Sequence, residues 1–309
     1  MTKLNNKILV ILGPTSSGKS SVAIKLAKKF NGEIISADSR QIYRGMDIGT
    51  GKVTVAEQKM APHWLIDIVS PKTDFNVTLF KKKAEKIIAN ILKRKKVPII
   101  CGGTGFWIKA AVDNVNFPEV KPDWKLRETL EKLTSAKLFA MLKKLDSERS
   151  KNIDKYNKRR LIRAIEICET IGKVPPLKRS DFKPAKVGPW EFLQIGIDVP
   201  REILHEKIKK RLKKRFQSGM IEEVKKLRKS GLGWKKIQSF GLAYFWIPLY
   251  LENKISLDEL YKRVYLAEKD YAKRQMTWFR KDKRILWLKS YKEIEKEIKK
   301  LLYTLHRSV

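Results

Sequence analysis

The sequence predicts an α/β fold, a parallel sheet flanked by helices with an inserted helical lobe. An apolar run at 7–12, a glycine-rich loop and a helical pattern at 21–30 follow one another directly. Two more short apolar runs, at 32–37 and 97–101, are separated by a segment of helical periodicity. A proline-bounded stretch dense in Lys and Arg then interrupts the alternation. We therefore expect a core of residues 1–115 and 190–309, which ends in helices, and an inserted helical domain at 116–189.

The glycine-rich loop fits the phosphate-binding pattern G-x-x-x-x-G-K-[ST]. It consists of Gly13, Pro14, Thr15, Ser16, Ser17, Gly18, Lys19 and Ser20. Its glycines let the backbone fold around phosphate oxygens, and free N–H groups at the start of the next helix attract anions. In this pattern Lys19 reaches the terminal phosphate and the Ser20 hydroxyl ligates Mg²⁺. Strand, loop and helix in this order predict a P-loop NTPase-like sheet, with an ordinary glycine turn as the alternative.

An ATPase would also need a strand that ends in a magnesium-binding Asp. The run from Trp64 to Asp67 is short, and the strand at 97–101 ends in Cys101 and then glycines. Neither run fits, so the sequence leaves open that the loop holds a diphosphate other than that of a nucleotide.

The charge balance predicts a polyanionic partner. The chain has 309 residues, with 69 Lys and Arg against 33 Asp and Glu, a net charge of +36. This excess favours nucleic acid as the partner. An anionic membrane surface and a compositional bias toward lysine are the alternatives.

The cysteines and the N-terminus predict a cytoplasmic protein. Cys101 and Cys168 are far apart, and with three scattered histidines they do not form a zinc-binding pattern. The apolar run at 8–12 is too short for a signal-peptide core or a membrane span.

Two turns after predicted strands carry residues suited to chemistry. The strand at 32–37 delivers Asp38 at its carboxyl end, where ligands sit in open parallel sheets. Asp38 is suited to act as a general base, and a turn or helix cap is the alternative. The strand at 97–101 leads into glycines around Thr104, which could hydrogen-bond a substrate, and into a helix at 106–112. Between these strands we expect a polar mobile loop at 44–61, a possible strand at 65–69 and a helix at 75–96.

The inserted domain and the C-terminal part read as mainly helical. Helical segments at 123–145 and 156–171 are expected in the insertion, the second with Lys158, Arg159, Arg160 and Arg163 near its start. These cations suit RNA phosphates, and a solvated helix face is the alternative. A strand at 192–199 and a helix from about 204 follow, with Arg211 and Arg215 at the margin of its apolar face. An apolar segment at 240–251, a helix at 257–281 and a strand at 285–288 precede a charged tail helix. In the helix at 257–281 the expected buried residues are Leu260, Val264, Ala267, Tyr271 and Trp278.

Taken together, five runs resemble the tRNA dimethylallyltransferase (tRNA isopentenyltransferase) family. They are 13–20, 38–50, 102–105, 159–164 and 272–280, and the resemblance extends from about Ile8 to Leu288. Three places depart from the family pattern. Trp64 stands where the family has His, Phe240-Gly241-Leu242 where it has Ile-Gly-Tyr, and Arg215 at a commonly apolar position.

The resemblance implies transfer of a dimethylallyl group from dimethylallyl diphosphate to the N6 nitrogen of the adenine 3′ of the anticodon. It implies that Asp38 is the general base, that Thr104 supports the amine, and that Arg211 and the P-loop hold the diphosphate with Mg²⁺ on Ser20. The implied tRNA-binding residues are Asp38, Ser39, Arg40, Gln41, Arg127, Lys158, Arg159, Arg160, Leu161 and Ile162.

The expected partners are the tRNA anticodon stem-loop and dimethylallyl diphosphate, with no membrane and a monomeric protein. Three alternatives remain at this point. They are an adenylate isopentenyltransferase acting on a free nucleotide, an RNA or nucleotide kinase, and an RNA-binding or chaperone protein with an inactive loop.

Overall fold

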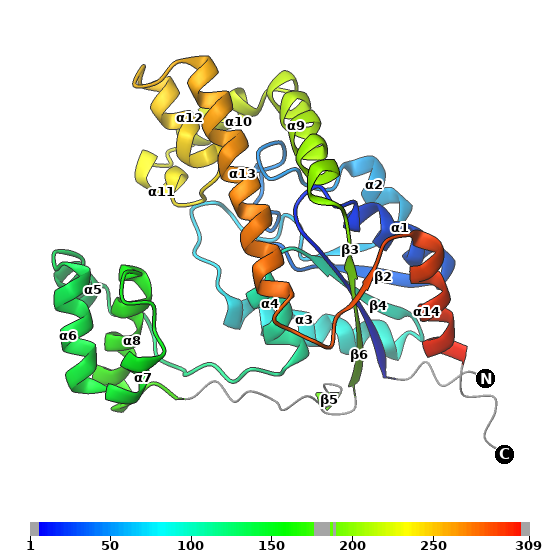
Figure 1. The fold of residues 1–309 in the computed structure, drawn as a ribbon, viewed down its shortest axis with the longest axis horizontal. Helices are drawn as coiled ribbons and strands as arrows, with labels where there is room; N and C mark the ends of the chain where they lie inside the picture. The colour runs from blue at the N-terminus through cyan, green and yellow to red at the C-terminus, as the bar shows by residue number, and fades with distance from the viewer. Residues whose placement is uncertain (1–5, 176–185, 188–189, 304–309) are drawn as a thin grey trace. The chain divides into compact units, whose positions relative to one another are not determined.

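The computed structural model describes residues 6–175, 186–187 and 190–303, which form two compact units (Figure 1). One unit combines Met1–Asn114 with Ser180–Val309, and the other is Val115–Arg179. The second unit runs from Val115 to Arg179, whereas the sequence assigns 116–189 to the insertion. Each unit has its own hydrophobic core, as expected for a segment that folds as a body of its own.

The larger unit is built on a mainly parallel sheet with β1 near its middle. Its strands are β1 (Lys7–Leu12), β2 (Gly32–Ser36), β3 (His63–Trp64), β4 (Val97–Gly102), β5 (Lys186–Val187), β6 (Trp190–Ile197) and β7 (Leu286–Leu288). Their order is β3-β2-β4-β1-β6, with β5 antiparallel to the start of β6 and β7 parallel to its end. The predicted α/β fold with a parallel sheet and flanking helices is confirmed.

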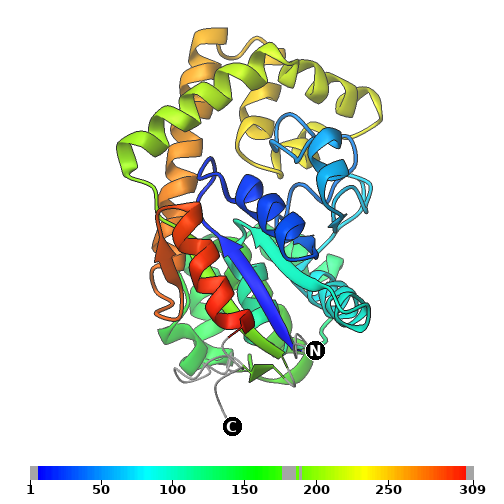
Figure 2. The ribbon, with the colours of Figure 1, turned by 90° about the vertical axis from the view of Figure 1, so that its right-hand side faces the viewer.

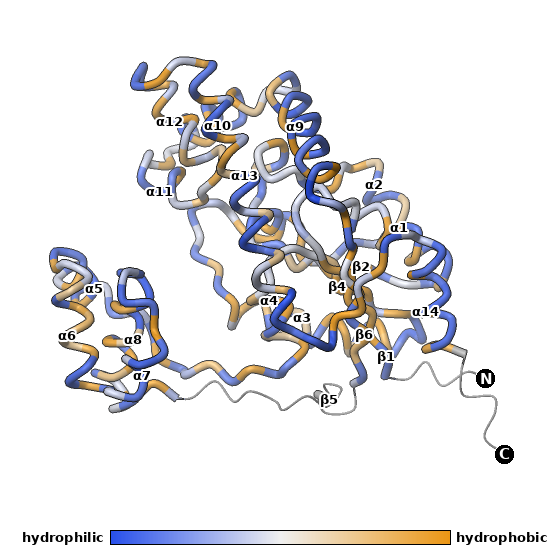
Figure 3. The backbone as a smooth tube through the Cα atoms, viewed as in Figure 1, coloured by the Kyte–Doolittle hydropathy of each residue, from blue (hydrophilic) through white to orange (hydrophobic). Residues whose placement is uncertain are grey.

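Alternation along β1 divides its side chains between the two faces of the sheet. Ile8, Val10 and Leu12 belong to one buried cluster, and Leu9 and Ile11 to the other, because successive strand residues point in opposite directions. Helices α3 (Val77–Lys93) and α4 (Gly105–Val112) pack on the first face. Helices α1 (Lys19–Lys29) and α14 (Tyr291–Tyr303) cover the second, with α14 beside β1 in Figure 2. The strands lie between these layers as an apolar centre in Figure 3.

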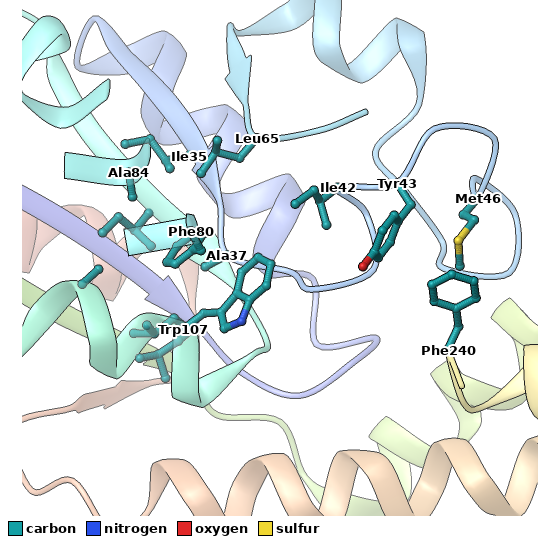
Figure 4. Close-up of a cluster of buried hydrophobic side chains, with 14 of the residues drawn as sticks. Ile35, Ala37, Ile42, Tyr43, Met46, Leu65, Phe80, Ala84, Trp107 and Phe240 are labelled. Carbon is teal, nitrogen blue, oxygen red and sulfur yellow. The ribbon is translucent and has the colours of Figure 1, made fainter. Parts of the chain in front are cut away.

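The first cluster continues from the sheet into a C-terminal helical layer. Close to the sheet Phe80 stacks on Trp107, with 4.5 Å between ring centroids (Figure 4). Farther from the sheet Tyr43 contacts Phe240, with 5.1 Å between their ring centroids. The layer consists of α9 (Arg201–Gln217), α10 (Met220–Lys229), α11 (Trp234–Gln238), α12 (Ala243–Leu251) and α13 (Leu257–Phe279). Since this packing is continuous, α9 and α13 are fixed relative to the sheet edge.

Two predictions between β2 and α3 are wrong. The strand lies at His63–Trp64 and not at 65–69, because Leu65 and Asp67 adopt φ angles of 63° and 55°, which extended strands do not allow. The segment 44–61, predicted as a mobile loop, contains α2 (Val55–Met60). Thr54 and Glu57 form a reciprocal capping box that starts this helix.

The buried stripe of α13 also differs from the prediction. Leu260 and Val264 are buried as expected, but Trp278 is 40% exposed. Beyond Val264 the buried positions are Glu268, Ala272, Gln275 and Phe279. An apolar-residue pattern could not find this stripe, because two of its members are polar and are buried against specific partners.

In its described part, residues 115–175, the smaller unit is a cluster of four helices. They are α5 (Trp124–Glu131), α6 (Ser135–Leu145), α7 (Ser147–Lys151) and α8 (Lys158–Ile171). The predicted segment 123–145 is split because Thr134 caps a new helix, its hydroxyl accepting from the Lys137 N–H. Leu138, Leu142, Leu161 and Ile165 form the core. Across the described part of the chain, every helix is too short or too polar to cross a bilayer.

Candidate active site

Three turns meet at the carboxyl edge of neighbouring strands β2, β4 and β1. The Ala37 N–H donates to the Cys101 carbonyl at 2.8 Å, and the Thr104 N–H donates to the Ala37 carbonyl at 3.2 Å. The turn after β2, which carries Asp38, is thereby bonded to the turn after β4. The P-loop follows β1 on the other side of β4. The strand order thus brings the three predicted motifs together.

The P-loop has the backbone geometry that phosphate binding needs. Gly18 begins α1 in a left-handed conformation, with φ 91°, and Ser16 has φ 62°. The hydroxyls of Ser16 and Ser17 are buried without a hydrogen-bond partner in the described residues. Buried hydroxyls are normally paired, so these two suit the oxygens of a bound anion.

Two cations accompany the loop. The Lys19 ammonium donates to the Pro14 carbonyl at 3.2 Å, and burial lowers its pKa while Asp38 opposes that shift. Arg211 on α9 donates from Nη1 to the Thr15 hydroxyl at 3.0 Å and from Nη2 to the Gly51 carbonyl at 2.9 Å. Burial likewise lowers the pKa of Arg211. A dianionic group in this cradle would relieve the cost of holding two buried cations close together.

Asp38 both closes a turn and faces the cavity. Its Oδ1 accepts from the N–H groups of Arg40 and Gln41, at 2.9 and 3.4 Å. Asp38 therefore does cap a turn, as the alternative interpretation of the sequence predicted. Within the described part of the chain no hydrogen bond uses Oδ2. Asp38 lines one cavity together with Lys19 and Ser20. One oxygen fixes the carboxylate, and the other remains available to a substrate.

Thr104 is tied to the same turn as Asp38. Its hydroxyl oxygen accepts from the Ser39 N–H at 3.1 Å and lies 3.4 Å from the Ser39 hydroxyl. Arg40 is held by the Phe240 carbonyl, to which Nε donates at 2.7 Å. Asp38 and Thr104, the two residues predicted to act on the substrate, are thus both held in position by the short segment 37–41.

Sequence reasoning missed two residues of α13 at this edge. The Gln275 side chain accepts from the Thr15 N–H and donates to the Gly103 carbonyl, both at 2.8 Å. Tyr271 is hydrogen-bonded to Thr104, and burial, followed by the charge of Asp38, raises its pKa. Both lie in or beside the run 272–280 that carried the family resemblance. Their spacing of four residues was the available signal, since it places them on one helix face.

A magnesium ion would find little protein ligation here. No group of three or more His, Cys, Asp and Glu side chains that could hold a metal occurs among residues 6–175, 186–187 and 190–303. The Ser20 hydroxyl lines the cavity near Asp38. Mg²⁺ usually keeps several waters and binds through few protein oxygens and substrate phosphates. The donor set fits an ion that arrives with a diphosphate.

Two departures from the family pattern have local explanations. Trp64 donates from its indole Nε1 to buried Glu33 at 2.8 Å. Arg215 is buried, donates to the Gly49 carbonyl at 2.9 Å and pairs with buried Glu268. Burial lowers the pKa of Arg215 to about 9, so it remains charged at neutral pH. The position tolerates a cation because α13 supplies a carboxylate.

The predicted RNA-binding residues of the smaller unit divide into two groups. Arg159 and Arg160 are exposed at the start of α8, and Lys158 is partly exposed. Leu161 and Ile162 are 0% and 4% exposed, so their side chains belong to the core of this unit. Arg127 binds Glu166 through Nε and Nη2, both at 2.8 Å, which gives it a structural role.

Comparison with known proteins decides the family. The family model described as IPP transferase matches residues 41–282. The chain belongs to the IPP transferase family. It is 41% identical over 308 residues to the tRNA dimethylallyltransferase of Carboxydothermus hydrogenoformans, with 97% of each chain covered. The predicted class of enzyme, a prenyltransferase, is confirmed.

Solved structures of the family agree with this fold. The tRNA delta(2)-isopentenylpyrophosphate transferase of Staphylococcus epidermidis is 37% identical, with a TM-score of 0.71 over 97% of this chain and 99% of that one. A eukaryotic dimethylallyltransferase crystallised while acting on tRNA has a TM-score of 0.73 over 97% of this chain and 77% of that one. At 22% identity this second likeness shows the fold alone.

Proposed function

We propose that this IPP transferase prenylates tRNA. It transfers a dimethylallyl group from dimethylallyl diphosphate to N6 of the adenine 3′ of the anticodon. The observation that supports this most directly is the meeting of Asp38, Thr104 and the P-loop at one sheet edge, where an ATPase would have a magnesium-binding carboxylate. A carboxylate base beside a diphosphate cradle suits displacement of diphosphate by an amine.

The P-loop and its two cations hold the donor. Lys19 and Arg211 neutralise the negative charge that grows on the bridging oxygen as its bond to carbon breaks, which is the kind of electrostatic stabilisation with the largest effect in many enzymes. A magnesium ion bound by the phosphates, with Ser20 as its protein ligand, would supply further charge neutralisation. Diphosphate is the leaving group, and nothing in the reaction requires a nucleotide.

Asp38 accepts the proton that the adenine amine loses in the proposed reaction. As N6 forms its bond to the allylic carbon, that nitrogen becomes cationic, and the carboxylate accepts its proton. Thr104 lies next to Asp38 and can bond the attacking amine. Because an adenine inside a helical stack cannot present N6 to the half-buried Asp38 carboxylate, the base must leave its stack.

Positive charge supplies the attraction for tRNA. The net charge of +36 favours binding along phosphates, and Arg159 and Arg160 are exposed for such contacts. Arg40 and Gln41 follow Asp38 in the same turn and suit contacts to the anticodon loop.

The test is mass spectrometry of unmodified tRNA after incubation with the protein, dimethylallyl diphosphate and Mg²⁺. We expect one adenosine, 3′ of the anticodon, to gain a dimethylallyl group, and a tRNA with guanosine there to gain none. Parallel incubations with AMP, and with γ-labelled ATP plus tRNA, test the free-nucleotide transferase and the kinase. Prenylated AMP in place of tRNA, or label in RNA, would contradict the proposal.

A further inference from the structure

One buried amide joins two segments of the active site. Gln275 is 5% exposed, and both ends of its side chain are used. Oε1 accepts from the Thr15 N–H of the P-loop, and Nε2 donates to the Gly103 carbonyl after β4. Loss of either bond would leave a buried polar group unpaired, which destabilises the folded protein.

Each partner of this amide leads directly to a residue that handles substrate. The Thr15 hydroxyl accepts from Arg211, the cation placed against the diphosphate. Gly103 precedes Thr104, which is bonded to the Asp38 turn. A Cβ added at Gly103 would lie 2.3 Å from Nε2 of Gln275, so the contact is as close as a glycine allows.

The neighbours of Gln275 on α13 face the same turn. Tyr271, four residues earlier, is hydrogen-bonded to Thr104. Trp278, three residues later, packs on Gly105, where an added Cβ would lie 2.2 Å from its ring. Residues spaced by three and four positions share one face of a helix. Tyr271, Gln275 and Trp278 therefore form one face of α13 that contacts each residue of the turn at 103–105.

We infer that Gln275 is a positioning residue, which sets the distance between the diphosphate cradle and Thr104. This rests on the proposed function, because the distance matters only where a leaving group and an attacking amine must meet. An amide side chain offers a donor and an acceptor on one planar group, which the two bonds of Gln275 require. A displacement of about 1 Å at a reacting pair can cost about 10²-fold in rate.

The first experiment compares Gln275→Met with Gln194→Met. Both remove an amide that is 5% exposed, but Gln194 lies within β6, away from the turns. We expect Gln275→Met to lower the single-turnover rate at saturating substrates by about 10²-fold, with the KM for tRNA little changed. Gln194→Met should lose stability without that loss of rate. Equal rates for the two folded variants would overturn the inference.

A second variant tests only the hydrogen bond that the Gln275 amide donates to the Gly103 carbonyl. Gln275→Glu keeps an acceptor for the Thr15 N–H but can donate to Gly103 only when its carboxyl is protonated. Its rate, divided by that of the wild type at each pH, should therefore rise as the pH falls. A ratio independent of pH would count against a positioning role.

A third measurement separates this inference from the proposed function. Hydrogen exchange of the P-loop amides reports the bond to Thr15 whether or not the wild type prenylates tRNA. Gln275→Met should speed this exchange and Gln194→Met should not. If the wild type makes no prenylated tRNA, the proposed function fails, while unchanged exchange would refute the link between α13 and the P-loop.

Discussion

Arg211 donates a hydrogen bond to the Thr15 hydroxyl at 3.0 Å and so joins α9 to a loop 196 residues earlier in the chain. The same guanidinium also binds the Gly51 carbonyl. Its planar fork holds two acceptors in a fixed geometry, which the compact ammonium of a lysine does not provide. The proposed diphosphate cradle is therefore built from the P-loop, α9 and the segment that carries Gly51. The first prediction tests the segment that carries Gly51.

Gly51→Ala should weaken the binding of dimethylallyl diphosphate, although it changes no residue of the P-loop. A Cβ at Gly51 would lie 1.7 Å from Nη2 of Arg211, so the guanidinium must move. We expect the KM for dimethylallyl diphosphate to rise about 10-fold or more, close to the effect of Arg211→Ala, because a charge-assisted hydrogen bond is worth about 1.5–3 kcal/mol. Steady-state kinetics at varied donor concentration measure it.

The matched control for this prediction is Gly45→Ala. Gly45 and Gly51 both have left-handed φ angles, 72° and 59°, so both alanines are strained. A Cβ at Gly45 meets nothing within 4 Å. If Gly45→Ala raises the KM as much as Gly51→Ala does, backbone strain and not the position of Arg211 is responsible.

Asp38→Asn should slow the chemical step and leave the turn intact. An asparagine keeps an Oδ1 that can accept from the Arg40 N–H but cannot take a proton from the amine. We expect single-turnover rates to fall by about 10²-fold or more, with tRNA affinity nearly unchanged. Rapid-quench kinetics and filter binding on the same preparation check both parts. A variant as fast as the wild type would remove Asp38 from the mechanism.

The exposed arginines of α8 should set part of the salt dependence of tRNA binding. Replacing Arg159 and Arg160 by Gln should reduce the slope of log affinity against log salt by about 1–2, since each lost phosphate contact removes about one unit. Replacing Lys292 and Lys296 on α14 by Gln changes the net charge equally and serves as the control. The same slope for both double variants would mean that only overall charge matters.

Glu33 should make stability depend on acidity below about pH 4.5. Hydrogen bonds from Arg94, aided by Lys96 and Trp64, lower the pKa of this buried carboxyl from 4.5 to about 2. Between these values the unfolded chain binds more protons than the folded one, so stability rises with pH through this window and is fully present above it. Glu33→Gln should have a lower free energy of unfolding at pH 7 and a shallower slope between about pH 2 and 4.5.

Urea unfolding at several pH values measures this slope, with Glu222→Gln as the control. Glu222 is 61% exposed and pairs with Lys225 at the surface, where an ion pair contributes about 0–1 kcal/mol. If both variants keep the slope of the wild type, Glu33 is not the group that titrates.

Most strands, the P-loop and the turns that carry Asp38 and Thr104 were predictable from the sequence because each depends on local chemistry. The run 7–12 alternates between two faces, and a glycine pattern marks the loop after it. Parallel strands end at a common edge, which brought Asp38, Thr104 and Lys19 together in the prediction.

The supports of these residues were not predictable, because they depend on contacts across the chain. Glu223 accepts from the N–H groups of Asp47, Ile48 and Gly49, more than 170 residues earlier, and so orders a segment that reads as a mobile loop. Gln275 sits in a helix whose apolar pattern points elsewhere. Leu65 ends a strand through a left-handed backbone angle that its residue type disfavours.

The bonds from Gln275 and Arg211 to Thr15 have a consequence for biosynthesis. During translation the P-loop leaves the ribosome early, but both of its distant partners belong to the last-made third of the chain. Domains fold as units, and a nascent chain that stops before residue 200 lacks α9 and α13 altogether. The growing polypeptide therefore completes the proposed diphosphate cradle only when its C-terminal helices emerge and dock.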